Sequence, residues 1–421
     1  MDSSTNRTTN VTRRLVLKGG AIAALGFGLG PRFLLRTASA ATPPRGRVLV
    51  ALFQRGAVDG LNMVVPHGEQ RYYAARPTIA IPRPGASGGA IDLDGFFGLH
   101  PAMASLAPAF DAGELAIVHA CGSPDPTRSH FDAQDFMETG EPGERNVADG
   151  WLNRHLQTVP EADASTVRAV ALASQMPRTL DGPAPALATT SLAEVAFGPP
   201  GQGALARRAV ERMYGSRDDL LGTATRDALD SLDVFASLDQ APYVPANGAR
   251  YPDTDLGAQL RDVARAIKGR VGLEIAFLNT GGWDTHVLEG ASEGQLATLL
   301  RGLADALAAF RTDLGDLMAD VCVLTMSEFG RTVAENGSVG TDHGRGTAMM
   351  VLGGTVRGGR VLGAWPGLAP DQLVEGRDLA VATDFRTLFS EVLVHHLGNP
   401  DVASVFSGFA WDDARRLGAI A

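Results

Sequence analysis

The sequence predicts an α/β protein with a mainly parallel central sheet, flanked by helices and carrying a helical insertion. Several short apolar runs show no alternation of apolar and polar residues, which is typical of strands covered on both faces. Stretches of helical periodicity separate these runs, as expected where helices connect parallel strands. With 421 residues, 45% of them hydrophobic, the chain can bury a sizeable core and is not expected to be disordered.

Six apolar runs are predicted strands, at residues 48–53, 115–120, 167–173, 273–279, 321–326 and 348–352. The clearest predicted helix spans residues 295–314, where leucines and alanines recur at helical spacing. Weaker helical periodicity is present at residues 101–112, 203–213, 256–268 and 385–397. The stretch 183–252 is rich in alanine, polar residues and proline and lacks convincing strands, so we expect a helical insertion or cap there rather than a second domain.

The first forty residues have the layout of an export signal. Arg13-Arg14 precede apolar residues, the stretch 19–30 is uncharged, and Ala38-Ser39-Ala40 forms a small-x-small cleavage site. This layout predicts a twin-arginine signal peptide over residues 1–40, recognition by the twin-arginine translocase, and a periplasmic or secreted mature protein. A membrane anchor is the alternative, but an anchor needs about 20 apolar residues and the uncharged stretch 19–30 is too short. No other segment reaches that length, so residues 41–421 are expected to form one domain without a stable membrane span.

Charge and composition exclude several classes of function. The formal net charge of −10 argues against nucleic acid as a partner, because binding to phosphates requires a basic surface. Cys121 and Cys322 are the only cysteines, which excludes a disulfide framework and a CxxC-type zinc site. The aromatic content of 6% leaves few rings for stacking on sugars, which weakens a third interpretation, a carbohydrate-binding module.

Polar clusters follow the predicted strands one after another. In an open α/β sheet, ligands bind outside the carboxyl ends of the strands, so these clusters are expected to meet at one edge. Carboxylate, imidazole, hydroxyl and guanidinium groups gathered there are what a divalent-metal or phosphoryl site needs. The candidate residues, in chain order, are Asp59, Ser129, His130, Asp284, His286, Glu328, Arg331, Asp342, His343 and Arg345.

Two Asp/His pairs are the strongest indication of a metal. Asp284 and His286 lie two residues apart, so on extended backbone they point to one side and could share one ion. Asp342 and His343 are adjacent, which suits a loop whose side chains reach different sites. Asp59 is either a ligand or a turn former. The predicted ligands of a divalent metal, with zinc or manganese favoured and calcium or magnesium as alternatives, are Asp59, Asp284, His286, Glu328, Asp342 and His343.

Ser129 is the favoured nucleophile, with Thr127 as the second candidate. The surrounding sequence predicts a loop that enters a helix near Phe131, so Ser129 could equally be the helix N-cap, and the two roles are compatible. A metal ion or His130 could activate its hydroxyl, and the metal is favoured because His130 would point elsewhere on extended backbone. Three arginines could hold oxyanions or could instead form salt bridges: Arg128, Arg331 and Arg345.

The motifs GGWDTH, SEFGRT, GTDHG, VDGLN and SHFDAQDFMETG resemble those of the domain-of-unknown-function family 1501, whose members are typically exported with a twin-arginine signal. That family is similar to a remote branch of the alkaline phosphatase and sulfatase superfamily, which holds divalent metals at the carboxyl edge of an α/β sheet. The resemblance implies an early aspartate ligand at Asp59, a nucleophile at Ser129, one metal pair at Asp284 and His286, and a last histidine at His343.

The sequence departs from the superfamily pattern in two places. The superfamily usually shows Asp-His after the late strand, whereas this chain has Glu328-Phe329, so one ligand is either missing or supplied by Asp342. A single metal and a degenerate site are therefore both open. The sulfatase signature begins with Cys or Ser, but Pro124 stands at that position, so a formylglycine sulfatase is not expected.

These observations predict an exported metal-dependent hydrolase of phosphate or sulfate esters, with a small molecule or a polysaccharide as substrate. The alternative is an exported binding or assembly protein that keeps the fold without turnover. Fold alone does not decide between them, because one fold serves many functions.

Overall fold

The structure is a computed structural model that describes residues 46–160, 167–192 and 243–421, short stretches between 207 and 229, and the backbone of two strands before residue 27. The predicted signal peptide at 1–40 lies largely outside the described residues. Of the predicted helix at 203–213, the described residues 207, 208 and 210–213 are helical, the last three in the π-helical turn η4, and the others lie outside the described residues. The same holds for most of the predicted insertion at 183–252, although Leu187–Thr189 forms a strand, β9, where the sequence predicted none.

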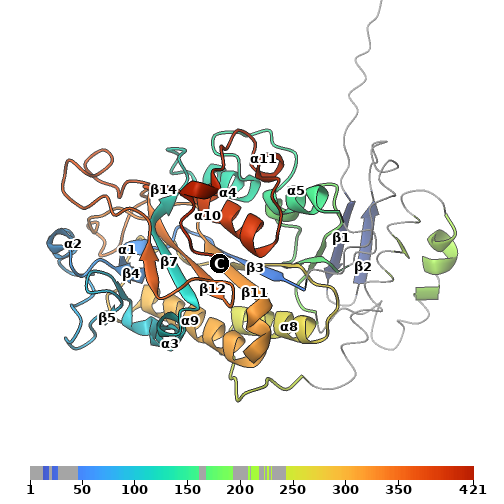
Figure 1. Ribbon diagram of the computed structural model, residues 1–421, viewed down its shortest axis with the longest axis horizontal. Helices are drawn as coiled ribbons and strands as arrows, with labels where there is room; N and C mark the ends of the chain where they lie inside the picture. Colours follow the sequence, from blue (N-terminus) through green and yellow to red (C-terminus); the bar gives the residue numbers. More distant parts are fainter. Residues whose placement is uncertain are drawn as a thin grey trace, which may run out of the picture.

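One mixed sheet runs through the molecule (Figure 1). In the described part of the chain it has 11 strands in the order β13-β7-β12-β11-β3-β10-β8-β9-β1-β2, and β14 pairs with β7. The strands are β1 Arg13–Lys18, β2 Ala21–Gly26, β3 Val48–Gln54, β7 Leu115–Gly122, β8 Ala169–Leu172, β9 Leu187–Thr189, β10 Ile275–Thr280, β11 Val321–Met326, β12 Thr347–Gly353, β13 Arg360–Leu362 and β14 Thr383–Asp384. A separate small sheet contains β4 Val64–Val65, β5 Ile91–Asp92 and β6 Gly98–Leu99.

The predicted mainly parallel sheet is confirmed, and all six predicted strands belong to it. Strands β11, β3, β10, β8 and β9 are mutually parallel, whereas β12 is antiparallel to both of its neighbours, β11 and β7. Because β12 reverses direction, the loop that leaves the carboxyl end of β11 returns to the same edge of the sheet. That loop therefore lies beside the loops that follow β3, β7 and β10.

Helices cover both faces of the sheet. Helices α3, α8 and α9 lie on one face and α4, α5, α10 and α11 on the other (Figure 1). The helices are α1 Gly60–Met63, α2 Gln70–Ala75, α3 Ala107–Asp111, α4 His130–Thr139, α5 Trp151–Thr158, α8 Asp255–Lys268, α9 Gln295–Leu314, α10 Phe385–Glu391 and α11 Val402–Val405. Short 3-10 and π-helical turns are η2 Pro101–Leu106, η3 Arg178–Leu180, η4 Glu211–Gly215, η5 Gly315–Asp320, η6 Val392–His396 and η7 Asp413–Arg415. Among the described residues, no helix is long and apolar enough to cross a membrane.

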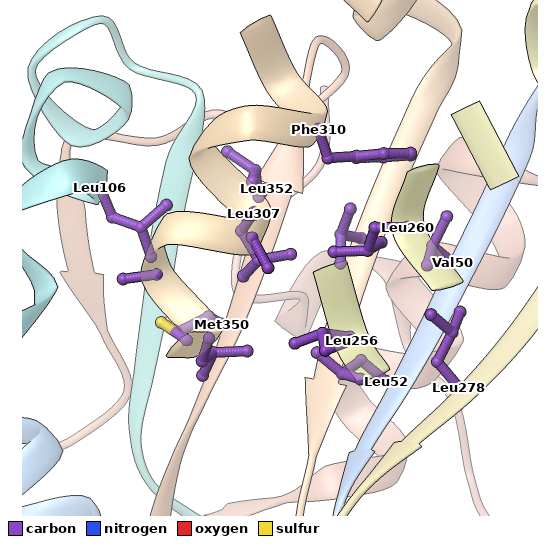
Figure 2. Packing of buried hydrophobic residues seen from close by; sticks show 14 of the residues in the cluster. Val50, Leu52, Leu106, Leu256, Leu260, Leu278, Leu307, Phe310, Met350 and Leu352 are labelled. Atoms are coloured by element: carbon purple, nitrogen blue, oxygen red, sulfur yellow. The ribbon is translucent and has the colours of Figure 1, made fainter. Parts of the chain in front are cut away.

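The core forms two layers, one on each face of the sheet. Along β3, Val50 and Leu52 point to the layer under α8 and α9, whereas Leu49 and Ala51 point to the layer under α5 and α10. Figure 2 shows the first layer, in which leucines of α8 and Phe310 of α9 pack against β3 and β10. Since both faces of the strand are buried, Val48 to Phe53 are all apolar, which explains the absence of alternation in the sequence.

Candidate metal centre

Three predicted side chains meet at the carboxyl edge of the sheet. His130 begins α4 after β7, Asp284 follows β10, and His343 lies between β11 and β12. One ligand atom from each lies within 4.8 Å of the other two. His130 was predicted as a catalytic residue, and the structure instead places it within this potential metal-binding group.

The distances within the group are short and nearly equal. His130 Nε2 lies 3.0 Å from His343 Nε2, and each of these atoms lies 3.5 Å from Asp284 Oδ1. His286 joins from the same loop as Asp284, with its Nε2 2.9 Å from His343 Nε2 and 3.0 Å from Asp284 Oδ1. Tetrahedral zinc with bonds near 2.0–2.1 Å would place its ligand atoms ~3.3 Å apart. The separations of 3.0–3.5 Å among His130, Asp284 and His343 therefore match the spacing of ligands around one ion.

The protonation of two rings follows from their other hydrogen bonds. His343 Nδ1 lies 2.9 Å from the carbonyl oxygen of Arg128, which can only accept, so this nitrogen carries the hydrogen. His130 Nδ1 donates in the same way to Glu328 Oε1 at 2.8 Å. In the neutral rings both Nε2 atoms then present lone pairs to each other at 3.0 Å, an arrangement that needs a cation or a proton nearby.

Glu328, predicted as a ligand, lies behind His130 and outside the group of potential ligand atoms. Its side chain is fully buried, and Oε1 accepts hydrogen bonds from His130, from Gln134 and from the backbone N–H of Gly56. Burial favours the neutral acid, but these hydrogen bonds outweigh it and lower the pKa of Glu328. A carboxylate that holds the far nitrogen of a ligating histidine is the usual support of a metal site.

The structure shows Arg331 as a salt-bridge partner, the second of its two predicted roles beside that of an oxyanion clamp. Its guanidinium is fully buried and donates to Asp284 Oδ1 at 2.6 Å. The remaining donors bind backbone carbonyls, including Ala57 at 2.6 Å and Trp283 at 3.1 Å. Burial would raise the pKa of Asp284, yet the contact with Arg331 lowers it. Arg331 therefore keeps Asp284 ionised and fixed, and its donors are not available to an anionic ligand.

Asp342 lies behind His286, outside the group of ligand atoms. Its Oδ1 is 3.4 Å from His286 Nδ1 and accepts a hydrogen bond from Asn336 Nδ2 at 3.0 Å. The far nitrogen of His286 thus faces a carboxylate, as the far nitrogen of His130 faces Glu328. Asp342, predicted as a ligand, thus takes the position of a carboxylate that supports His286.

Asp59, predicted as either a metal ligand or a turn former, caps α1 and forms an ion pair with Arg76. The carboxylate is buried after β3, where it caps α1 and binds the guanidinium of Arg76 through both oxygens. Arg76 is equally buried and also donates to Asn62 Oδ1 at 2.7 Å and to the carbonyl of Thr332 at 2.9 Å. Two buried opposite charges satisfy each other, which leaves no oxygen of Asp59 free for an ion.

Ser129 occupies the N-cap of α4, immediately before His130. The residue is exposed, and its Oγ accepts from the backbone N–H of Asp132 at the long distance of 3.5 Å. Thr127 Oγ1 accepts from the backbone N–H of Ser129 at 3.2 Å and so supports the cap. The cap role is confirmed, and the predicted role as a nucleophile remains compatible with it.

The two other arginines have partners of their own. Arg128 pairs with Asp378 and Glu375, and Arg345 donates to the carbonyl of Pro124 at 3.2 Å. Arg128 thereby serves the site through its backbone carbonyl, which orients His343, rather than through its guanidinium.

Glu289 is a site residue that the sequence analysis missed. Its buried Oε2 accepts from the hydroxyl of Thr285 at 3.1 Å and from that of Thr341 at 2.8 Å. Thr285 lies between Asp284 and His286, and Thr341 lies two residues before His343, so Glu289 joins the two ligand-bearing loops. No motif marks this residue, although an isolated acid between two apolar residues and a glycine is a signal that could have suggested burial.

Two glycines allow these loops to approach each other closely. Gly56 has a φ of +113°, and a Cβ atom there would lie 2.7 Å from the backbone nitrogen of Asp284. A Cβ atom on Gly340 would lie 2.4 Å from the carbonyl of His286. Any side chain at either position would displace a metal-site loop.

Replacing Glu289 by glutamine is expected to change how stability depends on pH. Burial raises the pKa of Glu289 well above its ordinary value of 4.5, and the nearby charge of Asp59 adds to this effect. The stabilisation from the protonated group is complete below the unfolded pKa and is lost as the pH rises toward the folded pKa. Ionisation of Glu289 should therefore lower the free energy of unfolding of the wild type by up to about 1.4 kcal/mol for each pH unit above 4.5.

Urea unfolding at several pH values measures the effect. Glutamine keeps the carbonyl that accepts from Thr285 and Thr341 and cannot ionise, so the variant should lose this decline with pH. Parallel pH profiles for the wild type and Glu289→Gln would show that Glu289 is ionised in the folded protein.

The fold and the site together define a class: an α/β protein with a His/Asp group able to hold a metal ion at the carboxyl edge of its central sheet. Within that class the chain belongs to the family described as protein of unknown function (DUF1501), whose sequence profile matches residues 47–401. The family membership predicted from the motifs is thereby confirmed. No curated protein matches the sequence significantly.

Two solved structures illustrate the remote structural similarity. The alkaline phosphatase from the Antarctic bacterium TAB5 is 12% identical, with a TM-score of 0.29, and the match covers 73% of this chain and 90% of that one. The PH0037 protein from Pyrococcus horikoshii is 11% identical, with a TM-score of 0.28 and coverage of 74% and 88%.

Proposed function

We propose that this protein is a divalent-metal-dependent hydrolase of phosphate or sulfate esters. The observation that carries the proposal is the close approach of three Nε2 atoms and Asp284 Oδ1, with separations of 2.9–3.5 Å. The carboxylates behind His130 and His286 and the carbonyl behind His343 add the support that ligating histidines need. Substrates would be esters of small molecules or of polysaccharides.

Zinc or manganese fits this set of donors best. Three imidazoles and one carboxylate suit these ions better than magnesium or calcium, which prefer oxygen ligands. A bound divalent ion would supply Lewis-acid charge that neutralises the ester oxygens and lowers the pKa of an attacking hydroxyl.

Ser129 is the proposed nucleophile. Its exposed hydroxyl stands at the N-terminus of α4, next to His130, and its cap bond of 3.5 Å holds it only weakly. The ring of His130 is committed through Nδ1 to Glu328 and through Nε2 to the cluster, so it does not serve as the base. In the reaction, Ser129 Oγ bonds to phosphorus or sulfur, the alcohol departs with a proton, and water then releases the acid from the serine.

Ser129→Ala is expected to abolish turnover of an activated aryl phosphate or sulfate and to leave metal content unchanged. The cap bond is long, so the stability loss should be at the low end for an N-cap, about 0.5 kcal/mol. Release of the aryl alcohol, followed by absorbance with each metal supplied, measures turnover. Full activity in Ser129→Ala would show that the serine is only a cap and that water attacks directly.

A second candidate is a non-catalytic binding or assembly protein. One observation favours it: the guanidiniums of Arg331 and Arg128, at the edge of the centre, are committed to other groups and do not face an anionic ester. Metal-loaded protein that turns over no ester in a broad panel would support this candidate.

We also infer export by the twin-arginine translocase into the periplasm or beyond. The inference rests on Arg13-Arg14 and on Ala38-Ser39-Ala40 in the sequence. Replacing both arginines by lysine should leave the precursor in the cytoplasm, because the translocase recognises arginine and not charge alone. Immunoblotting of cell fractions measures this, and a processed periplasmic double variant would contradict the inference.

A further inference from the structure

Four exposed apolar side chains lie in the chain segments around the candidate metal centre, and we call them the collar: Phe131, Val287, Leu288 and Val339. Their exposed fractions are 91%, 57%, 69% and 37%. Among the described residues, only Met213 and Val244 are further large hydrophobic residues with comparable exposure. Most exposed large apolar side chains of the described residues thus lie in the segments that carry the potential ligands, and a concentration of such side chains is a common sign of a binding surface.

The collar is attached to the ligand residues themselves. Phe131 directly follows His130, and Val287 and Leu288 directly follow His286. Val339 lies on the opposing turn, where its carbonyl accepts from the backbone N–H of Glu289 at 2.9 Å. Exposed apolar side chains therefore adjoin the segments that carry His130 and His286, either directly in sequence or across the backbone hydrogen bond between Glu289 and Val339.

Neither packing nor backbone preference explains these side chains. Leu288 and Val339 have φ values of 50° and 58°, a left-handed conformation that favours glycine or asparagine. A β-branched residue such as valine is a rare outlier there. Backbone strain of this kind concentrates at functional sites, so an exposed and strained apolar side chain points to a role in binding.

We propose that the collar binds an apolar group of the substrate, so that the natural substrate is an amphiphilic ester with an alkyl or aryl group beside the phosphate or sulfate. This inference rests on the proposed hydrolase function and narrows its substrate class. Complete burial of one methylene group would increase affinity by about fourfold. Polysaccharide esters fit less well, since Phe131 is the only aromatic residue in the collar.

A single amphiphile fits the collar better than an anionic lipid surface. The carboxylates of Asp284 and Asp342 both lie beside His286 and are exposed, with side-chain exposures of 45% and 58%. The whole chain carries a formal net charge of −10. Both features repel an anionic membrane, whereas one ester group can be held at the metal with its apolar part on the collar.

A series of alkyl phosphates tests the proposal. In the zinc- or manganese-loaded wild type, kcat/KM for octyl phosphate should exceed that for ethyl phosphate by at least tenfold. In Leu288→Asn/Val339→Asn the ratio should fall toward one, and asparagine tolerates the left-handed backbone, so the variant should fold. Val244→Asn is the matched control, because it removes an exposed apolar side chain outside the collar and should keep the wild-type ratio.

Binding without turnover separates this proposal from the proposed function. Octylphosphonate and methylphosphonate cannot be hydrolysed, and calorimetric titration of metal-loaded protein compares their affinities. Tighter binding of octylphosphonate, lost in the double asparagine variant, supports the collar even if no ester is turned over. Equal affinities overturn the collar, and turnover of ethyl phosphate would then leave the hydrolase function standing.

Discussion

Replacing Asp284 by asparagine is expected to remove the metal and abolish ester turnover together. Asp284 Oδ1 is the only carboxylate oxygen in the group of ligand atoms formed by the described residues, and it lies 3.0–3.5 Å from three imidazole nitrogens. Asparagine keeps an oxygen for the hydrogen bond from Arg331 but loses the charge that attracts a cation. Losing a direct ligand should weaken metal affinity by more than about 100-fold, the upper range for residues that only support a ligand.

Metal content by mass spectrometry and thermal unfolding measure this loss. A metal that binds only the folded state adds about 2.7 kcal/mol of stability at 100 times its dissociation constant. Wild-type protein should therefore unfold at a lower temperature after chelation, whereas Asp284→Asn should not respond to chelator.

Asp342→Asn is the matched control for Asp284→Asn. Asp342 lies 3.4 Å from the far nitrogen of His286, so its loss should weaken metal affinity by about tenfold without removing the ion. Full metal content in Asp284→Asn would place any metal elsewhere and would remove the basis of the proposed hydrolase.

The sheet was predictable because a strand that is buried on both faces consists of a continuous run of apolar residues. Strand β3 has no polar residue from Val48 to Phe53, since alternate side chains enter the two core layers. The antiparallel direction of β12 could not be predicted in this way, because its residues are as fully buried as those of the parallel strands. The convergence of the loops at one edge followed from the predicted fold, and His130, Asp284 and His343 confirm it.

The roles of individual residues were less predictable than their location. Glu328 and Asp342 lie beside the candidate centre. Whether a carboxylate would bind a metal directly or hydrogen-bond to a ligating histidine depends on small differences in distance, which the sequence does not contain. Asp59 was expected to be a ligand because it follows the first strand. Its partner Arg76, at the C-cap of α2, could be recognised only once the loop between them was folded.

Replacing Arg76 by methionine is expected to have the largest effect on stability. Asp59 would remain buried without its cation, and breaking a buried ion pair by removing one partner typically costs about 3–5 kcal/mol. The carbonyls of Thr332 and Val333 would also lose the donor that Arg76 provides, whereas Asn62 Oδ1 would keep the hydroxyl of Tyr72 as its donor. Urea unfolding at neutral pH measures the loss.

The double variant Arg76→Met/Asp59→Asn tests the cause. Although burial opposes it, Arg76 lowers the pKa of Asp59 below its ordinary value of 3.8. The stabilisation from Asp59 is therefore present above the unfolded pKa and is lost as the pH falls through the folded pKa. Without Arg76 this dependence should reverse, and the neutral asparagine should recover part of the stability at neutral pH. Asp59→Asn should also retain full metal content, because an ion-paired carboxylate does not hold the metal, whereas loss of metal would restore Asp59 as a ligand.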